Sequence, residues 1–273
     1  SDVCSSDLAI VTRFIVTACC VVSLPLSAAV GQPSSPGPKL GKPWENSLGM
    51  KFVPVPGTNV LFSIWETRVQ DFEAFVEATN YDAGEAWRVP GGPGQEYAAG
   101  FSQTPSHPVA NVNWNDVDAF CRWLTKKERA AGRLSAEQEY RLPTDAEWSL
   151  AVGLLAESGA TPEEKSEKIE NVYPWGAEFP PPQGSGNYSG DWDLWSSGAI
   201  DGHPDGFKFA APVGSYTANP LGIYDLGGNL WEWCSDWSNA EQNARVVRGA
   251  SFLQGVPRFL LSSHRSPISP GRR

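Results

Sequence analysis

The stretch that decides the fold is DLGGNLWEWCSDW, residues Asp225 to Trp237. It combines three tryptophans, a Gly-Gly pair, two acids before the cysteine and one thiol, Cys234. Cys234 has two interpretations: a reactive thiol in an aromatic pocket, or a small residue packed beside the tryptophans. Alternation of side chains around the Gly-Gly turn would also bring Asp225 and Glu232 to one centre, which predicts a metal site.

The composition is that of an ordinary globular protein, with 41% hydrophobic and 19% charged residues in a chain of 273. This length suffices for one large domain with a sizeable core. Twelve tryptophans together with 27 glycines and 23 prolines predict a loop-rich fold, with a core of large aromatic side chains and many turns. The formal net charge of -10 argues against nucleic acid and anionic membranes as partners, because both would repel the protein.

The N-terminal residues carry two signals that are separate from the domain. Residues 1–8 include DVCSSDL, the peptide encoded by a common sequencing adapter, and are expected to be a sequence artefact. Residues 9–29 combine Arg13, the apolar run Phe14 to Leu24 and small residues before a cleavage point after Ala29, which predicts a signal peptide. We therefore expect an exported protein, either periplasmic or secreted.

Two alternatives for this segment are less favoured. The apolar run is too short to cross a bilayer and Pro25 ends it, so we expect no membrane span in the mature chain. A lipoprotein site at VTAC, residues 16–19, conflicts with the apolar run that continues past the cysteine. Cleavage would leave Cys121 and Cys234, which could form a disulfide in an oxidising compartment.

Residues 30–43 have the composition of a Pro/Gly/Ser linker, and residues 44–273 that of the domain. Within the domain, TRVQDFEAFVEATN (67–80) predicts an amphipathic helix that opens with a capping box formed by Thr67 and Gln70. Apolar residues at helical spacing place one face of this helix against the core.

Two further helices have clear start signals. One is predicted from its cap Asn113 to Gly132, with Cys121 on the buried stripe, which favours a core thiol over a catalytic one. The other begins at a capping box of Thr144 and Glu147. A strand-like run, ARVVRGASF, follows the tryptophan cluster.

From Asn171 to Gly228 the sequence shows no regular periodicity and is rich in Gly, Pro, Asn, Asp and aromatic residues. Such a stretch is too long for a passive surface loop, so something other than a strand ladder is expected to hold it in place. Bound metal is one candidate.

Five blocks occur in the order and rough spacing of the formylglycine-generating enzyme, or sulfatase-modifying factor, family. They are HPVANVNWNDVDAFCRWL, YRLPTDAEWSLAVG, YPWG, GIYDLGGNLWEWCSDW and RVVRGASF. The resemblance implies an α+β, C-type-lectin-like single domain that is loop-rich, with a few helices and short, mostly antiparallel strands. Members close with a Gly-Phe-Arg strand, and we expect this chain to stop short of it.

The founding enzymes of this family oxidise a cysteine of a client sulfatase to formylglycine with molecular oxygen. They use two cysteines after an RGGS segment, which also bind copper. Here Gln254 stands about where the first cysteine belongs, the second position falls near Pro257 or Arg258, and no thiol follows Ser251. Because a thiolate is the nucleophile and the soft metal ligand in that chemistry, no catalytic residue and no copper are expected. The family commonly carries Thr or Cys at the position of Cys234, which favours the packed interpretation.

The resemblance also implies two calcium sites made of hard oxygen ligands. The alternative is that the same acids are turn formers and solvated surface residues. The first site would use Asn187, the carbonyl of Tyr188, Asp205 and the carbonyl of Phe207, and the second Asp225, the carbonyls of Gly228 and Leu230, and Glu232.

A binding cleft is expected at Trp231, Ser251, Gln254 and His264, with a peptide or protein client, for which a sulfatase is one candidate. The predicted function is thus an accessory or binding module. The alternative is an oxidoreductase of the same family that uses other residues or a partner domain with non-haem iron, because the only histidines, His107, His203 and His264, lie in turn contexts. Ser262 and Ser263 adjoin His264, but sequence neighbours do not make a catalytic triad.

Overall fold

The computed structural model describes residues 16–17, 19–25, 37–88, 103–189 and 198–273. The fold is α+β, with two short-stranded sheets, four α-helices and two 3-10 turns in these ranges. Six of the seven strand pairings are antiparallel. The predicted fold class is confirmed. The expected artefact at residues 1–8, the cleavage point after Ala29 and residues 30–36 of the linker lie outside the described residues.

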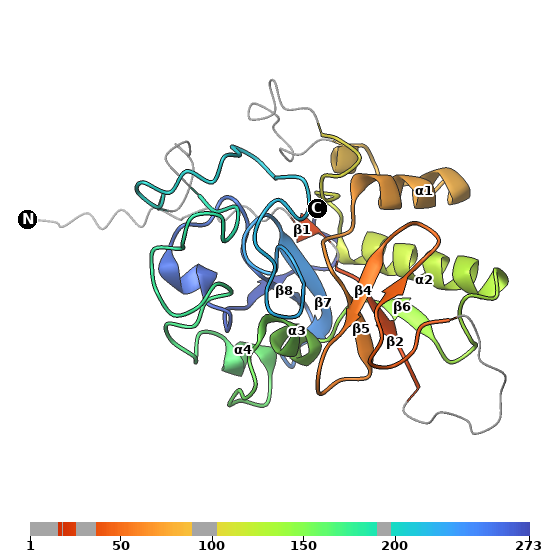
Figure 1. The fold of residues 1–273 in the computed structure, drawn as a ribbon, viewed down its shortest axis with the longest axis horizontal. Helices are drawn as coiled ribbons and strands as arrows, with labels where there is room; N and C mark the ends of the chain where they lie inside the picture. Colours follow the sequence, from red (N-terminus) through yellow and green to blue (C-terminus); the bar gives the residue numbers. More distant parts are fainter. Residues whose placement is uncertain (1–15, 18, 26–36, 89–102, 190–197) are drawn as a thin grey trace, which may run out of the picture.

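A five-stranded antiparallel sheet forms one half of the molecule (Figure 1). Its spatial order is β3-β4-β5-β2-β6: the first three strands follow the sequence order, whereas β2 lies between β5 and β6. The helices α1 and α2 lie in the same half of the molecule. The strands are β3 (Trp44–Glu45), β4 (Lys51–Pro54), β5 (Val60–Ser63), β2 (Val21–Ser23) and β6 (Glu139–Arg141).

A four-stranded sheet in the other half carries the tryptophan block. Its order is β1-β7-β8-β9, and the β7 strand also packs against α3. The four consecutive residues Trp231 to Cys234 are all buried, which shows that this part of the strand is covered on both faces. The strands are β1 (Val16–Thr17), β7 (Trp231–Trp237), β8 (Arg245–Arg248) and β9 (Ser266–Ile268).

The helices start and stop close to their predicted positions. They are α1 (Val69–Thr79), α2 (Trp114–Ala130), α3 (Asp145–Val152) and the short α4 (Pro162–Lys165), with 3-10 turns at Ala86–Arg88 and Pro257–Leu260. The predicted N-cap Asn113 of α2 and the predicted capping box of α3 are confirmed, and Asn113 also forms a capping box with Asp116.

The cap predicted for α1 is wrong. Arg68 is the N-cap residue, and Asp71 accepts a hydrogen bond from its backbone nitrogen at 3.1 Å. The Arg68 guanidinium also pairs with the Asp71 carboxylate at 2.9 Å. This ion pair moves the helix start by one residue relative to Thr67, which is fully buried instead.

The prediction that the stretch from Asn171 to Gly228 lacks regular structure is confirmed for its described residues. Residues 171–189 and 198–228 contain no helix or strand. An isolated bridge joins Tyr173 and Gly176. Aromatic packing orders part of this stretch, since Tyr173 stacks on Trp175 with ring centroids 4.8 Å apart. Trp175 in turn meets the buried ring of Tyr188 edge-on.

The apolar N-terminal run is packed into the two sheets and is not detached from the domain, as a signal segment would be. Its described residues form β1 and β2, and Cys20, Val21 and Val22 are fully buried. The signal peptide thus remains a prediction that competes with a structural role for the same residues. No helix in the described ranges is long and apolar enough to cross a membrane.

Candidate functional site

The turn before β7 contains several residues in the left-handed region of backbone conformation. Asp225, Gly228 and Asn229 all have positive φ angles, of 59°, 80° and 57°. At Gly228, a Cβ atom would lie 2.3 Å from the backbone oxygen of Asn187, so no side chain fits. The glycine therefore lets the turn press against the Asn187 segment, which brings the two predicted calcium-binding stretches into contact.

Asp225 lies at the start of this turn and is 6% exposed. Its Oδ2 accepts a hydrogen bond from the backbone nitrogen of Gly214 at 2.8 Å. Its Oδ1 has no hydrogen-bond partner among the described residues. Burial raises the pKa of Asp225 to about 6, because the charged form loses its hydration.

Glu232 points into the same region from β7 and is 1% exposed. Its Oε2 accepts a short hydrogen bond from the indole nitrogen of Trp148, whereas its Oε1 has no partner among the described residues. Burial raises the pKa of Glu232 to about 8, and the negative charge of Asp225 adds to this shift. A buried acid with an unsatisfied oxygen is costly unless a cation or a proton compensates it.

A third buried acid, Glu66, was missed in the sequence. Its carboxylate accepts hydrogen bonds from the side-chain nitrogen of Asn229 at 2.6 Å and from the backbone nitrogen of Leu230 at 3.1 Å. Burial raises the pKa of Glu66, and the charges of Asp225 and Glu232 raise it further. An acid directly after the apolar run VLFSIW was the signal that could have identified it. Glu66 therefore holds the turn between the two other acids.

The residues of the first predicted calcium site are also neighbours. Asn187 is fully buried, and its Oδ1 has no partner in the described part of the chain. Asp205 accepts hydrogen bonds from the backbone nitrogens of Tyr188 at 3.2 Å and Phe207 at 3.1 Å. Both carboxylate oxygens of Asp205 thus accept hydrogen bonds within a turn. Asp205 therefore fits the interpretation as a turn former better than Asp225 and Glu232 do.

The donor set decides which metal these residues fit. No group of three or more His, Cys, Asp or Glu side chains in the described ranges is arranged to hold a metal ion. A site at the turn would therefore combine the free oxygens of Asp225 and Glu232 with backbone carbonyls. Carboxylate and carbonyl oxygens fit a hard cation such as Ca²⁺ and fit copper poorly.

The four residues expected to line a binding cleft are buried. Trp231, Ser251, Gln254 and His264 are each 5% exposed or less. They form two internal pairs: Ser251 donates from its hydroxyl and its backbone nitrogen to Gln254 Oε1, and the Trp231 and His264 rings lie 5.7 Å apart. Gln254 therefore closes a local turn with Ser251 inside the protein.

His264 is placed between Glu167 and Ser266 and not beside a reactive hydroxyl of Ser262 or Ser263. Its Nδ1 lies 2.9 Å from the Glu167 carboxylate and its Nε2 lies 3.0 Å from Ser266 Oγ. Burial lowers the pKa of His264 to about 4, so the ring is neutral at pH 7. Ser266 is buried on β9 and borders neither cavity described below, which indicates a structural link.

Cys234 is fully buried in β7, within a cluster that includes Trp148 and Val246. Burial raises the pKa of its thiol well above the usual range, which disfavours the reactive thiolate. Contact with the thiol of Cys20 and burial raise the pKa of Cys121 in the same direction. Both thiols are free. Cys234 is packed in the core as expected, but beside Trp148, because Trp231 and Trp233 belong to the other cluster.

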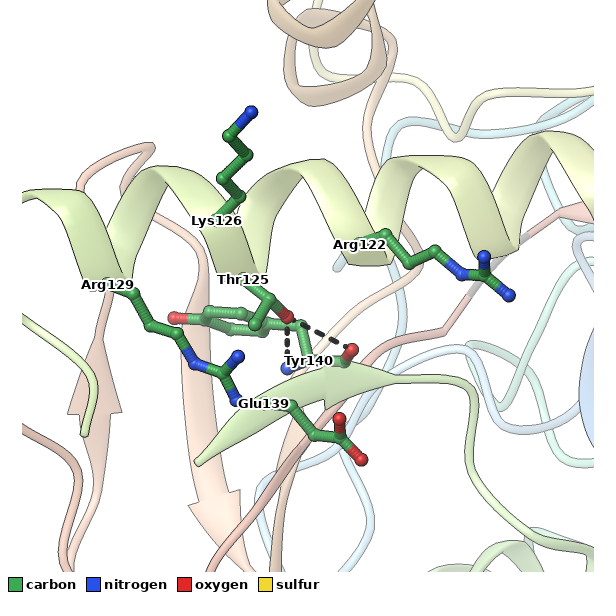
Figure 2. Close-up of a pocket in the computed structure, with 6 residues that line it drawn as sticks. All are labelled: Arg122, Thr125, Lys126, Arg129, Glu139 and Tyr140. Carbon is green, nitrogen blue, oxygen red and sulfur yellow. Dashed lines mark hydrogen bonds between the residues drawn. The ribbon is translucent and has the colours of Figure 1, made fainter. Parts of the chain in front are cut away.

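Two cavities open near these elements. One of about 270 Å³ borders Asp225 and is lined by Trp175, Gln183 and Leu226 among others. The other, of about 320 Å³, lies between α2 and β6, where Thr125 bonds the backbone of Tyr140 (Figure 2). Two arginines line this second cavity. Arg122 pairs with Asp118, and Arg129 donates to the carbonyl of Gln138.

Residues 58–273 match a family described as "Sulfatase-modifying factor enzyme 1-like domain". The chain is 32% identical over 191 residues to the formylglycine-generating enzyme of Thermomonospora curvata, covering 62% of this chain and 51% of the relative. It is 35% identical over 173 residues to "Inactive C-alpha-formylglycine-generating enzyme 2" of Bos taurus, covering 61% and 44%. The chain thus spans about half the length of the curated relatives it matches.

The fold is similar to that of a solved structure, PvdO from Pseudomonas aeruginosa. The TM-score is 0.57 and the sequence identity 21%, and the alignment covers 87% of this chain and 95% of PvdO. At this identity the likeness concerns the fold alone.

Proposed function

Because the chain belongs to the sulfatase-modifying factor family, we propose that it is a calcium-stabilised binding module for a peptide or protein client and does not generate formylglycine. The observation that carries the proposal is the position of Gln254. Its side chain closes a turn with Ser251, and the segment that follows contains no thiol. An amide cannot form the thiolate that attacks or binds copper.

The remaining thiols in the described residues support the same proposal. Cys19, Cys20, Cys121 and Cys234 are all buried, so none is placed to meet a client peptide. Among curated relatives, one from Bos taurus and one from Mus musculus carry the word "Inactive" in their names, at 35% and 36% identity. A family domain without oxidase activity therefore has precedent.

Calcium is the second part of the proposal. Asp225 and Glu232, with the carbonyls of Gly228 and Leu230, would hold the ion, which would neutralise buried negative charge. Support comes from the unpartnered oxygens of the two acids and from the third acid, Glu66, held close to them. An iron-dependent activity would need ligands from another domain, because the described residues offer no suitable group.

The test measures binding and turnover on one peptide. A labelled peptide with a Cys-x-Pro-x-Arg sequence is incubated with copper and the protein, then analysed by mass spectrometry and by fluorescence anisotropy. We expect saturable binding without any change in peptide mass. The formylglycine-generating enzyme of Thermomonospora curvata serves as the positive control for turnover. A mass loss that corresponds to aldehyde formation contradicts the loss of activity, and absence of binding contradicts a client that carries this sulfatase-type sequence.

A further inference from the structure

The five-stranded sheet has a gap between β5 and β6 that a single short strand fills. Residue Val22 of β2 lies opposite Leu61 of β5 on one side and opposite Tyr140 of β6 on the other. The pairing is extended at both ends: the Ser63 nitrogen donates to the Cys20 carbonyl at 2.9 Å, and the Leu24 nitrogen donates to the Asn59 carbonyl at 3.0 Å. Figure 1 shows β2 inside the sheet, beside β5 and β6.

Side chains of this segment alternate between two separate parts of the core. Cys20, Val22 and Leu24 join the cluster that contains Phe52 and Phe120. The odd-numbered Cys19 and Val21 join the cluster that contains Trp148 and Cys234. This is the period-two alternation of a strand that is covered on both faces.

The Cys20 thiol fixes the position of the segment relative to α2. Its Sγ lies 3.4 Å from Sγ of Cys121 and 3.7 Å from Oγ1 of Thr67. Without residues 19–24, the facing edges of β5 and β6 would lose their backbone partners inside the protein, where water cannot replace them.

We propose that the gap between β5 and β6 is a strand-acceptor site and that its occupant is residues 19–24 of the same chain. The site selects an extended segment that is apolar on both faces and small enough for the Cys121 side, since every side chain at 19–22 is 1% exposed or less. The folded domain is complete only while this segment stays in place. Removal at a cleavage point after Ala29 would therefore take away a structural strand.

The main experiment nicks the folded protein between strand and domain. A site for a specific protease is inserted between residues 30 and 36, the full chain is purified and cut, and the products are separated by size exclusion under native conditions. We expect the N-terminal fragment to co-elute with the domain and to separate only in denaturant.

Two outcomes overturn the proposal. One is release of the fragment from a domain whose melting temperature and circular dichroism stay unchanged. The other is a cut domain that forms a dimer after releasing its fragment, since a second copy would then fill the gap.

A second measurement tests the register of β2, that is, whether Cys20 or Cys19 faces Cys121. The reduced full chain, with Cys4 replaced by Ser, is refolded in a glutathione redox buffer, and its disulfides are mapped by mass spectrometry. Two thiols lose two protons and two electrons to glutathione disulfide, which is reduced to two glutathiones. We expect a Cys20–Cys121 link, whereas a Cys19–Cys121 link, or no link to residue 20, contradicts the placement.

A pair of variants tests the apolar requirement. Val22→Asp places a charge in the filled gap, and Leu155→Asp places the same charge at a residue that is 89% exposed. We expect Val22→Asp to lower the melting temperature strongly and to expose Cys121 to alkylation in the native state, with neither effect for Leu155→Asp. Equal melting temperatures for the two variants would contradict the acceptor site.

Discussion

At the scale of residues, His264 shows how burial controls charge. The ring is held between Glu167 and Ser266, yet loss of hydration outweighs the nearby carboxylate and lowers its pKa to about 4. A histidine with a lowered pKa contributes stability that is present above its ordinary value of about 6.5 and is lost as the pH falls through its folded value. A tenfold difference in proton affinity between the folded and unfolded states corresponds to about 1.4 kcal/mol in the free energy of unfolding.

We therefore predict that the free energy of unfolding falls between pH 6.5 and pH 4 partly through His264. His264→Gln is expected to be less stable than the unmodified protein at pH 7, because it loses ring contacts, but the difference should shrink as the pH falls towards 4. Urea unfolding at several pH values measures this. Parallel profiles for the two proteins would show that the ring does not titrate in this range.

Several site residues could be predicted one by one. Asp225 and Glu232 were identified because acids beside a Gly-Gly turn are visible in the sequence. Glu66 was not, since its partners Asn229 and Leu230 are more than 160 positions away. The residues expected to line a cleft, Trp231, Ser251, Gln254 and His264, are buried in two separate pairs, and their burial depends on packing that no local pattern encodes.

At the scale of elements, the first turn of α3 links the helix to the second sheet. Asp145 accepts hydrogen bonds from the buried guanidinium groups of Arg248 and Arg265, and these charges lower its pKa. Arg265 also pairs with Glu157 at 2.7 Å. Removing the Asp145 carboxylate is costly, because Arg248 is fully buried and would then have no carboxylate partner, whereas Arg265 would keep Glu157.

We predict that Asp145→Ala destabilises the protein by about 3–5 kcal/mol. The matched control is Thr144→Ala, which removes the adjacent helix cap and leaves the ion pairs intact, at a cost of about 1 kcal/mol. Urea unfolding followed by tryptophan fluorescence compares them. If the two variants lose equal stability, the network adds nothing beyond the helix cap.

Helices were easier to predict than strands for a physical reason. A capping box such as Thr144 with Glu147 is a local signal, because the two residues bond to each other's backbone. The strands have at most seven residues, and the partners of β1 and β2 in particular lie far from them in the chain. An apolar run such as Phe14 to Leu24 satisfies both a signal peptide and a buried strand, so periodicity could not distinguish them.

At the scale of the whole molecule, calcium would join the irregular stretch to the sheets. Residues 198–228 lack regular structure, and the turn at their end packs directly on Asn187. An ion at Asp225 and Glu232 would hold that turn to β7. Since the ion binds only the folded state, it stabilises the protein by mass action.

We predict that a chelator lowers the melting temperature of the unmodified protein. At free calcium near 100 times the dissociation constant, the stabilisation amounts to roughly 2.7 kcal/mol. Asp225→Ala and Glu232→Ala should each abolish most of the response, while Glu77→Ala, at an exposed position on α1, should retain it. Thermal melts with and without chelator provide the measurement. Identical melts of the unmodified protein in both conditions would remove calcium from the proposal.

Gly228 is required for a different reason than Asp225 and Glu232: the glycine is needed by the fold, and the two acids would be needed by the ion. The backbone of Gly228 presses so closely on Asn187 that any side chain is excluded, with or without a metal ion. Selection for the fold alone will therefore preserve this glycine in active and inactive relatives alike. Asp225 and Glu232 have no such steric constraint. A relative that lacks both acids is therefore expected to lack the ion. A relative that keeps both acids but lacks the cysteine pair is expected to bind the ion without the oxidase activity.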